Sequence, residues 1–215
     1  MKKIAVVLAG NGVFDGAEIH EATLTLYAIV KQGSTYDIFA PNINQHHVIN
    51  HITGEEMSEK RNVLIEAARV ARGKISDLAN FDPNSYDALI FPGGFGVAKN
   101  LCSFAFNGAN CSINEDVEKA IKAMIKLSKP IAALCIAPVL LAKILSGVEL
   151  TIGKDASTKE AVIAMGANHK ETNHGEVVID KKFKIVTTPC YMLDANIEQI
   201  AEGANNAVKA ILNLI

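Results

Sequence analysis

Short apolar runs alternate along the chain with stretches in which apolar residues recur every three or four positions. The short runs are continuously apolar, which is typical of strands buried on both faces, and the periodic stretches predict helices. Strands separated by helices predict an α/β fold with a mostly parallel sheet covered on both faces, and such a sheet carries its active site at the carboxyl ends of the strands. The expected strands are Ile4–Leu8, Asp37–Ala40, Ala88–Phe91, Ile131–Leu134 and Ile185–Thr188. The expected helices are Ala17–Lys31, Val63–Arg72, Val117–Leu127, Pro138–Leu145, Lys159–Met165 and Asn196–Leu214.

The domain organisation follows from length and from the spacing of these elements. A chain of 215 residues with 49% apolar residues is sufficient for one substantial core and too short for two full domains. No linker, repeat or low-complexity segment divides it. Residues 41–86 are long for one connection and contain a helix, so we interpret them as an insertion. Residues 150–180 are similar, with a hairpin expected around Val177–Val186. We therefore predict a single domain over residues 1–215 with an insertion at about 41–86.

Charge and hydropathy narrow the range of partners. The formal net charge is −2, and the densest basic group, Lys181, Lys182 and Lys184 around Phe183, is typical of a solvated hairpin turn. A nucleic-acid-binding protein normally presents a basic face. No apolar run reaches the length of a membrane span. We expect neither a nucleic acid nor a membrane as partner.

The four cysteines, Cys102, Cys111, Cys135 and Cys190, form no C-x-x-C pair and no zinc-finger spacing. A chain of this size does not need disulfides, so free thiols in a reducing compartment are expected. The apolar run near the N-terminus stops at Gly10, too early for a signal peptide, and is better explained as the first strand. These features favour a cytoplasmic protein.

A glycine-rich segment follows the first strand. Gly10, Gly12 and Gly16 are spaced G-x-G-x-x-x-G, one residue away from the dinucleotide-binding fingerprint. That fingerprint also requires an acidic residue at the end of the second strand, where this chain has Ala40-Pro41. A loop over the sheet is favoured over nucleotide binding, and no cofactor is expected.

The segment around Cys135 is the most informative part of the chain. A buried strand runs into Cys135, and Pro138 suits the first turn of a helix that starts directly afterwards. Such a strand–nucleophile–helix elbow requires small residues two positions before and after the nucleophile, here Ala133 and Ala137. The helix N-terminus would favour the thiolate. An inert buried cysteine is the alternative, but the elbow favours Cys135 as a nucleophile; the other three cysteines lack this context.

A second glycine-rich turn ends the strand Ala88–Phe91. It reads Pro92-Gly93-Gly94-Phe95-Gly96, and its glycines allow backbone N–H groups to point into a site. We expect the N–H groups of Gly93, Gly94 and Ile136 to form an oxyanion hole beside Cys135. An ordinary turn is the alternative interpretation.

These two motifs together resemble the PfpI-like, class I glutamine amidotransferase-like superfamily, and the whole chain is most similar to its ElbB branch, also described as enhancing-lycopene-biosynthesis or sigma cross-reacting proteins. The branch resemblance rests on Asp15–Glu21, Val48–Glu55, Arg61–Arg69, Pro92–Leu101 and Val186–Met192. It implies a flavodoxin-like three-layer sandwich, a homodimer, and a glutamate beside the thiol. Glu21 and Glu18 both match that region, and the distance to the end of the helix at Gln32-Gly33 favours Glu21. Exposed helix carboxylates are the alternative.

The chain departs from the superfamily in its histidines. Relatives with amidotransferase or protease activity pair the cysteine with a histidine, either directly after it, where this chain has Ile136, or on the strand after the elbow helix, where it has Leu150-Thr151-Ile152. His20, His169 and His174 remain as candidates, and His169 fits the pattern of the branch. His46, His47 and His51 lack a carboxylate or cysteine at metal-site spacing, so no metal is expected.

Three functions are compatible with this set of residues. The superfamily resemblance implies a cofactor-independent glyoxalase that converts glyoxal to glycolate through a hemithioacetal on Cys135, with Glu21 as acid/base; the same groups could act as a protein deglycase. A non-catalytic redox-sensing or regulatory protein linked to isoprenoid biosynthesis is the alternative. A glutamine amidotransferase is less favoured because the partner histidine is missing. The glyoxalase requires a small dicarbonyl substrate and no cofactor. The C-terminal helix is apolar on one side and could pack on the sheet or on a second subunit.

Overall fold

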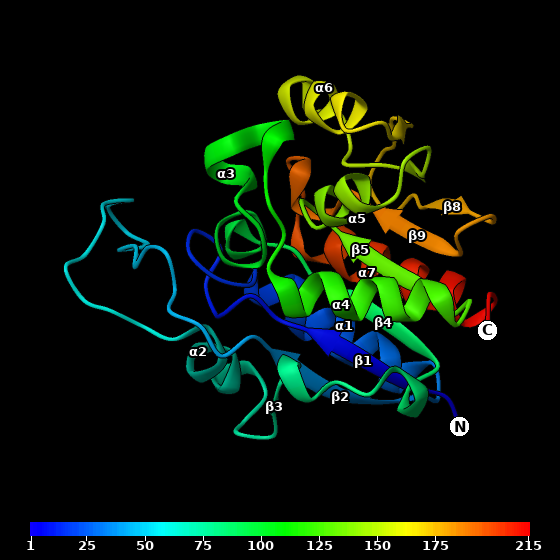
Figure 1. The fold of residues 1–215 in the computed structure, drawn as a ribbon, viewed down its shortest axis with the longest axis horizontal. Coiled ribbons are helices and arrows are strands. Elements are labelled where there is room, and N and C mark those ends of the chain that lie inside the picture. Colours follow the sequence, from blue (N-terminus) through cyan, green and yellow to red (C-terminus); the bar gives the residue numbers. More distant parts are fainter.

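The computed structural model describes residues 1–215 and has a central sheet of seven strands between two layers of helices (Figure 1). The strand order is β3-β2-β1-β4-β5-β9-β8, and every neighbouring pair is parallel except β8 and β9. This arrangement confirms the predicted α/β class and the flavodoxin-like sandwich with a mostly parallel sheet.

The elements alternate along the chain as the apolar pattern predicts. The strands are β1 Lys3–Val7, β2 Thr35–Ala40, β3 Ser76–Asp77, β4 Ala88–Phe91, β5 Ile131–Leu134, β6 Glu149–Leu150, β7 Asn168–His169, β8 Val178–Asp180 and β9 Ile185–Thr188. The α-helices are α1 Ile19–Lys31, α2 Val63–Val70, α3 Phe104–Asn107, α4 Glu115–Lys126, α5 Pro138–Ile144, α6 Ala156–Ala164 and α7 Ile197–Leu212. A π-helical turn covers Val97–Leu101, and single 3-10 turns cover Leu78–Asn80, Pro83–Ser85, Gly108–Asn110 and Cys190–Met192.

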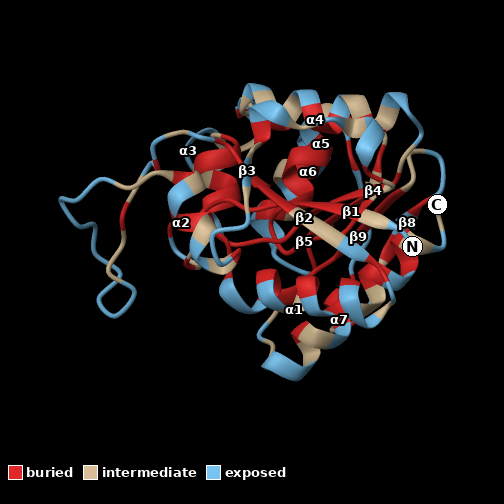
Figure 2. Cartoon of the chain, turned by 90° about the horizontal axis from the view of Figure 1, so that it is seen from below, coloured by how far each residue is buried: buried red, intermediate tan, exposed pale blue.

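The core lies on both faces of the central strands. All residues of β4, β5 and β9 are buried, which is why β4 and β5 are continuous apolar runs and β9 has two apolar residues followed by two buried threonines. Figure 2 shows α1 and α7 on one side of the sheet, and α4, α5 and α6 on the other, each with its buried residues turned inward. The apolar side of α7 packs on β9 and α1 of the same chain, so it covers the sheet. The homodimer stays a prediction.

The expected insertion is partly built into the sheet. Its first half is a long loop, visible on the left in Figure 1. The outgoing and returning parts of this loop pair only at isolated β-bridges, between Asn44 and Asn62 and between Ile49 and Glu56. Its second half contributes α2 and then β3, which pairs with the carboxyl end of β2 at the edge of the sheet. A two-residue strand such as β3 has too few residues for a hydrophobic period to be visible in the sequence.

The segment before the last strand also contains more structure than expected. β8 and β9 form the predicted antiparallel hairpin. β6 and β7 form a separate two-stranded parallel sheet that the sequence pattern did not predict. None of the helices is both long enough and apolar enough to cross a bilayer.

Candidate active site

Cys135 occupies a strained elbow between β5 and α5. Its φ angle is +60°, a left-handed conformation that is uncommon for residues with a side chain. The Cys135 N–H donates to the Thr188 carbonyl at 2.9 Å, which continues the pairing of β5 with β9 to the very end of the strand. Ala133 and Ala137 are fully buried on either side, and Pro138 is the first residue of α5. These features match the elbow expected from the sequence.

Glu21 is brought to the thiol by the start of α1. The helix begins at Ile19, and Glu18 is its N-cap, with Oε2 accepting the Glu21 N–H at 2.7 Å. Glu21 therefore lies in the first turn of the helix, on its buried side, and its side chain is completely inaccessible to solvent. Its carboxyl contacts the Cys135 sulfur and accepts N–H groups from Gly93 at 2.8 Å and from Tyr191 at 3.2 Å.

The topology of the sheet explains why these segments meet. β1 lies between β2 and β4: after β1 the chain moves outward to β2 and β3 on one side, and it then returns to place β4 on the other side of β1. A crevice forms at the carboxyl ends of strands where the order reverses in this way. Glu21 follows β1, Gly93 follows β4, Cys135 follows β5 and Tyr191 follows β9, so four separate segments contribute to one site.

The electrostatics of the pair depend mainly on burial. Burial raises the pKa of Glu21 from its ordinary 4.5 to about 7; the nearby Glu18 charge raises it further, and the N–H of Tyr191, the Cys135 thiol and the N–H of Gly93 oppose the rise. Burial and then the Glu21 charge raise the pKa of Cys135 well above 9.0, although the N–H groups of Gly94 and Ile136 at the sulfur act in the opposite direction. Burial thus acts against the thiolate that the helix N-terminus alone would favour.

The expected oxyanion-hole residues have two different roles. The Gly94 and Ile136 N–H groups face the sulfur, as the sequence suggests. The Gly93 N–H is already donated to Glu21, so it orients the carboxyl instead. A Cβ at Gly93 would overlap Cys135 Cβ and lie 2.5 Å from Glu21 Oε2 and 2.9 Å from Cys135 Sγ. Glycine at this position lets the thiol and the carboxyl touch.

The histidines are not brought to the thiol. The Nε2 of His169 accepts the Ile152 N–H at 3.3 Å beside the small β6–β7 sheet, its Nδ1 is buried without a hydrogen-bond partner, and burial lowers its pKa. His20 lies nearest the site, where its Nδ1 is 2.8 Å from the Tyr191 hydroxyl at the exposed rim. His46 packs on Phe106 with ring centroids 4.1 Å apart. No group of three or more His, Cys, Asp or Glu side chains is arranged to hold a metal ion.

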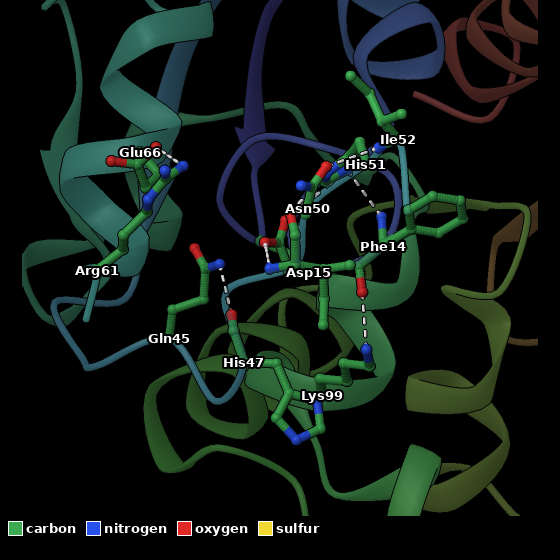
Figure 3. Close-up of polar contacts among 12 residues, drawn as sticks. Phe14, Asp15, Gln45, His47, Asn50, His51, Ile52, Arg61, Glu66 and Lys99 are labelled. Atoms are coloured by element: carbon green, nitrogen blue, oxygen red, sulfur yellow. Dashed lines mark hydrogen bonds and ion pairs between the residues drawn. The ribbon is translucent and has the colours of Figure 1, made fainter. Parts of the chain in front are cut away.

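The glycine-rich loop after β1 packs closely against other backbone. A Cβ on Gly96 would lie 2.5 Å from the Gly16 backbone, so the loop is held directly against the turn after β4. Two hydrogen bonds join the insertion to this loop. The buried Asp15 carboxylate accepts the Ile49 N–H at 2.7 Å, and His51 Nε2 accepts the Phe14 N–H at 3.2 Å (Figure 3). Glycine is needed here for close backbone packing, which agrees with the interpretation as a loop over the sheet.

A cavity of about 400 Å³ opens above the thiol. Most of its wall is apolar, and its two charged residues, Glu18 and Asp155, are both acidic. The lining residues are Val13, Glu18, Gly94, Phe95, Ala98, Phe104, Ala105, Cys135, Ile136, Asp155, Ser157, Thr158, Tyr191 and Met192. A cavity of this size, which leads to a buried nucleophile, has the shape of a small-molecule site.

Sequence reasoning missed several of these residues. Tyr191 enters the sequence analysis only within the family segment Val186–Met192, yet its N–H donates to the Glu21 carboxyl and the residue lines the cavity. Its position directly after the fully buried strand β9 was the available signal, because parallel strands end at the same edge. Phe104 and Asp155 lie on helices far away in sequence, and no local pattern identifies them as cavity residues.

Known proteins resemble this chain over almost its whole length. The human glutamine amidotransferase-like class 1 domain-containing protein 3, mitochondrial, is 46% identical over 222 residues, covering 99% of this chain and 83% of the human one. The crystal structure of an isoprenoid biosynthesis protein with an amidotransferase-like domain from Ehrlichia chaffeensis matches with a TM-score of 0.92 at 32% identity, over 99% of this chain and 100% of that one. Glyoxalase III from Candida albicans matches with a TM-score of 0.65 at 16% identity, over 100% and 97%, and so shares the fold.

These relatives correct the expected location. The human protein and a rat relative, the ES1 protein homologue, are mitochondrial proteins, which contradicts the expected cytoplasmic location. The expectation of a cytoplasmic protein was wrong because free cysteines argue against an oxidising compartment but do not distinguish one reducing compartment from another.

The family itself is shown by the match of a family model to most of the chain. The model of the DJ-1/PfpI family matches residues 2–196, which include the elbow, the glutamate and the glycine-rich turn after β4. This match confirms the expected PfpI-like superfamily, and the ElbB branch within it stays a prediction. The chain belongs to the DJ-1/PfpI family.

Proposed function

We propose that this protein is a cofactor-independent glyoxalase that converts glyoxal to glycolate, with Cys135 as nucleophile and Glu21 as acid/base. The observation that carries the proposal is the contact between a buried thiol and a buried carboxyl whose pKa lies at about 7. A general acid/base works best when its pKa is near the working pH. The shared fold of glyoxalase III is consistent with this chemistry.

The first step is the addition of the thiol to one aldehyde carbon. The Glu21 carboxylate takes the proton from Cys135 as the C–S bond forms, and this removes the need for a free thiolate. The former carbonyl oxygen becomes an alkoxide between the N–H groups of Gly94 and Ile136, which already point toward the sulfur. Glu21 passes the proton on to that oxygen, which gives the hemithioacetal and restores the Glu21 carboxylate.

The second step moves a proton between the two carbons. Glu21 removes the C–H proton of the hemithioacetal carbon. The electron pair forms a C=C bond as the C=O π bond of the second carbon opens, and the hydroxyl proton on the first carbon passes to the second oxygen, which gives an enediolate. Glu21 then returns its proton to the second carbon while the C=O bond re-forms beside the sulfur, and water hydrolyses the resulting thioester to release glycolate and the Cys135 thiol. The sum is one glyoxal and one water to one glycolate, so no redox partner is needed. The two backbone donors from Gly93 and Tyr191 hold the carboxyl in place throughout.

The test is glycolate formation from glyoxal by the purified protein without glutathione or added metal. We expect turnover in the native chain, and its loss in Cys135→Ala and in Glu21→Gln. Glu160→Gln, an exposed carboxylate on α6, is the matched control and keeps full activity. Absence of turnover in the native protein, at protein concentrations that would reveal one event per minute, would contradict the proposal.

A regulatory protein linked to isoprenoid metabolism is the second candidate, and the Ehrlichia chaffeensis isoprenoid biosynthesis protein favours it. In that role Cys135 would be oxidised to a sulfenic or sulfinic acid. A native chain without turnover, whose Cys135 reacts readily with peroxide, would favour this function. An amidotransferase is disfavoured, since the partners of the sulfur are Glu21 and backbone N–H groups rather than a histidine ring.

A further inference from the structure

Two cysteines outside the elbow lie at the base of one surface lobe. The lobe consists of residues 103–110, with α3 and the 3-10 turn Gly108–Asn110, and Cys102 and Cys111 are its two ends. Both thiols are buried, at 5% and 2% exposure, whereas Ala105, Phe106, Asn107 and Asn110 of the lobe are exposed. The two cysteines thus close a solvent-facing loop from beneath.

The backbone places both side chains together. Cys102 pairs antiparallel with Ile113, and Ser103 N–H donates to the Ser112 carbonyl at 2.9 Å. In such a ladder a residue and its diagonal neighbour two positions along the partner strand share one face. Cys111 is that diagonal neighbour of Cys102, and the two thiols are in hydrogen-bond contact.

The surroundings make the two thiols unequal. The Cys102 thiol can donate to Cys111 or to the Val97 carbonyl, which is 3.3 Å away. The hydrogen bond from Cys102 and the nearby Lys143 ammonium lower the pKa of Cys111 to about 7, against the effect of burial. The same contact, together with burial, raises the pKa of Cys102. Lys143 is held at the lobe by its hydrogen bond to the Ala109 carbonyl at 3.0 Å. Two thiols in contact, one of them beside a lysine ammonium, have the arrangement of an attacking and a resolving cysteine, with Cys111 as the candidate for attack.

We propose that Cys102 and Cys111 are a second redox site, at which a hydroperoxide converts the two thiols into an intrachain disulfide. The Cys111 thiolate attacks the peroxide oxygen, the O–O bond breaks, and a sulfenic acid and hydroxide form. The Cys102 sulfur then attacks the sulfenic sulfur, its proton leaves with the departing oxygen as water, and the S–S bond closes. Both sulfurs are oxidised, and one peroxide is reduced for each disulfide.

The disulfide would act on the neighbouring site through the lobe. Phe104 and Ala105 line the cavity above Cys135, and Phe106 packs on His46 and His47 of the insertion. A bond across the base of residues 103–110 restricts the movement of this wall. The proposal does not depend on the glyoxalase reaction, because it requires only the geometry of the lobe.

The experiment uses the Cys135→Ala chain, so that the elbow thiol does not contribute. Three of the four free cysteines remain in this variant: Cys102, Cys111 and Cys190. On treatment with hydrogen peroxide we expect free thiols to fall from three to one per chain, reversibly with dithiothreitol. Peptide mapping should join Cys102 to Cys111, and the amides of residues 103–110 should exchange hydrogen more slowly afterwards.

Variants assign the two roles. Cys102→Ser in the same background should leave a sulfenic acid on Cys111 that a cyclic-dione reagent traps, whereas Cys190→Ser should leave the disulfide unchanged. The proposal would be overturned if Cys102 and Cys111 both stayed reduced at a peroxide dose that oxidises Cys135 in the native chain. A disulfide that involves Cys190 or a second chain would also overturn it. The mapping in the Cys135→Ala chain decides the matter even where a serine variant does not fold.

Discussion

Glu21 and Glu66 are both buried carboxylates in the first turn of an α-helix, yet their surroundings differ completely. Glu66 is met by two guanidinium groups: Arg69 Nε donates to its Oε2 at 2.9 Å, and Arg61 Nη1 lies 3.5 Å from the same oxygen (Figure 3). Glu21 has no cation; its neighbours are two backbone N–H groups, a thiol and a second glutamate.

The difference separates a structural carboxylate from a reactive one. A buried carboxylate with arginine partners has its charge compensated and helps to fix the fold. A buried carboxyl that lacks a cation keeps its proton to higher pH, and such uncompensated groups concentrate at functional sites. Burial alone would not have separated the two, because both side chains are almost inaccessible.

The largest expected effect is on activity. Glu21→Gln should lower kcat/KM for glyoxal by about 10²–10⁴-fold, the range for loss of a general acid/base, because the amide cannot take a proton from Cys135. Glu66→Gln should change it less than about twofold, since that side chain does not reach the cavity. Steady-state assays on both variants test the contrast, and equal losses would show that the two carboxylates are not functionally different.

The next effect is on stability as a function of pH. The folded-state pKa of Glu21 is raised from 4.5 to about 7, so the folded chain binds this proton more tightly than the unfolded chain does. The contribution of this group is therefore fully present below about pH 4.5 and is lost as pH rises through about 7. A shift of this size corresponds to about 3 kcal/mol.

Urea unfolding of the native chain and of Glu21→Gln measures this difference. The native chain should lose stability relative to the variant between about pH 4.5 and 8, and the gap should level off above that range. A constant difference across the range would mean that Glu21 ionises normally in the folded protein.

A smaller change in the free energy of unfolding is expected for Glu66→Gln. Replacement by glutamine removes the charge that pairs with Arg61 and Arg69, whose side chains are 34% and 62% exposed and therefore screened by solvent. We expect a loss of about 1 kcal/mol in the free energy of unfolding at neutral pH. Arg69→Gln is the matched control and should cost less, since Arg61 remains. A gain in stability would contradict the structural role assigned to this carboxylate.

The smallest effect is a change in the pKa of Glu21 itself. The Glu18 charge is the second cause of the raised value, after burial. Glu18→Gln keeps an oxygen that can accept the Glu21 N–H and removes the charge, so the pKa of Glu21 should fall below about 7. The acidic limb of the pH profile of kcat/KM should move toward lower pH. An unchanged or higher midpoint would show that Glu18 does not act on Glu21 through its charge.

The sequence predicts the Cys135–Glu21 half of this contrast better than the Glu66 half. The elbow at Cys135 and the central strands are local patterns, since an apolar run, two small residues and a proline lie next to each other in the chain. Glu21 was favoured through the family resemblance and the length of its helix. The pairing of Glu66 with Arg69, three residues along the same helix, is a local pattern, but the burial of Glu66 and its contact with Arg61 depend on how the insertion folds.

The remaining features depend on contacts between distant segments. The raised pKa of Cys135 comes mainly from burial, which no local pattern records, whereas the helix dipole considered alone favours the opposite direction. His169 fits a family pattern, but its ring faces Ile152 at the small β6–β7 sheet, whose strands are too short to show a period. The contact of Cys102 with Cys111 requires the lobe between them to close, which spacing in the sequence does not reveal.

The reactivity of the site depends on Glu21 being a buried carboxyl with a pKa near neutrality beside the Cys135 thiol. Infrared titration tests it directly, through the carbonyl stretch of the protonated carboxyl in the difference between the native chain and Glu21→Gln. The account predicts a band that disappears with a midpoint at about pH 7, and that is still present in Glu66→Gln. A midpoint near 4.5, the ordinary value for glutamate, would contradict it.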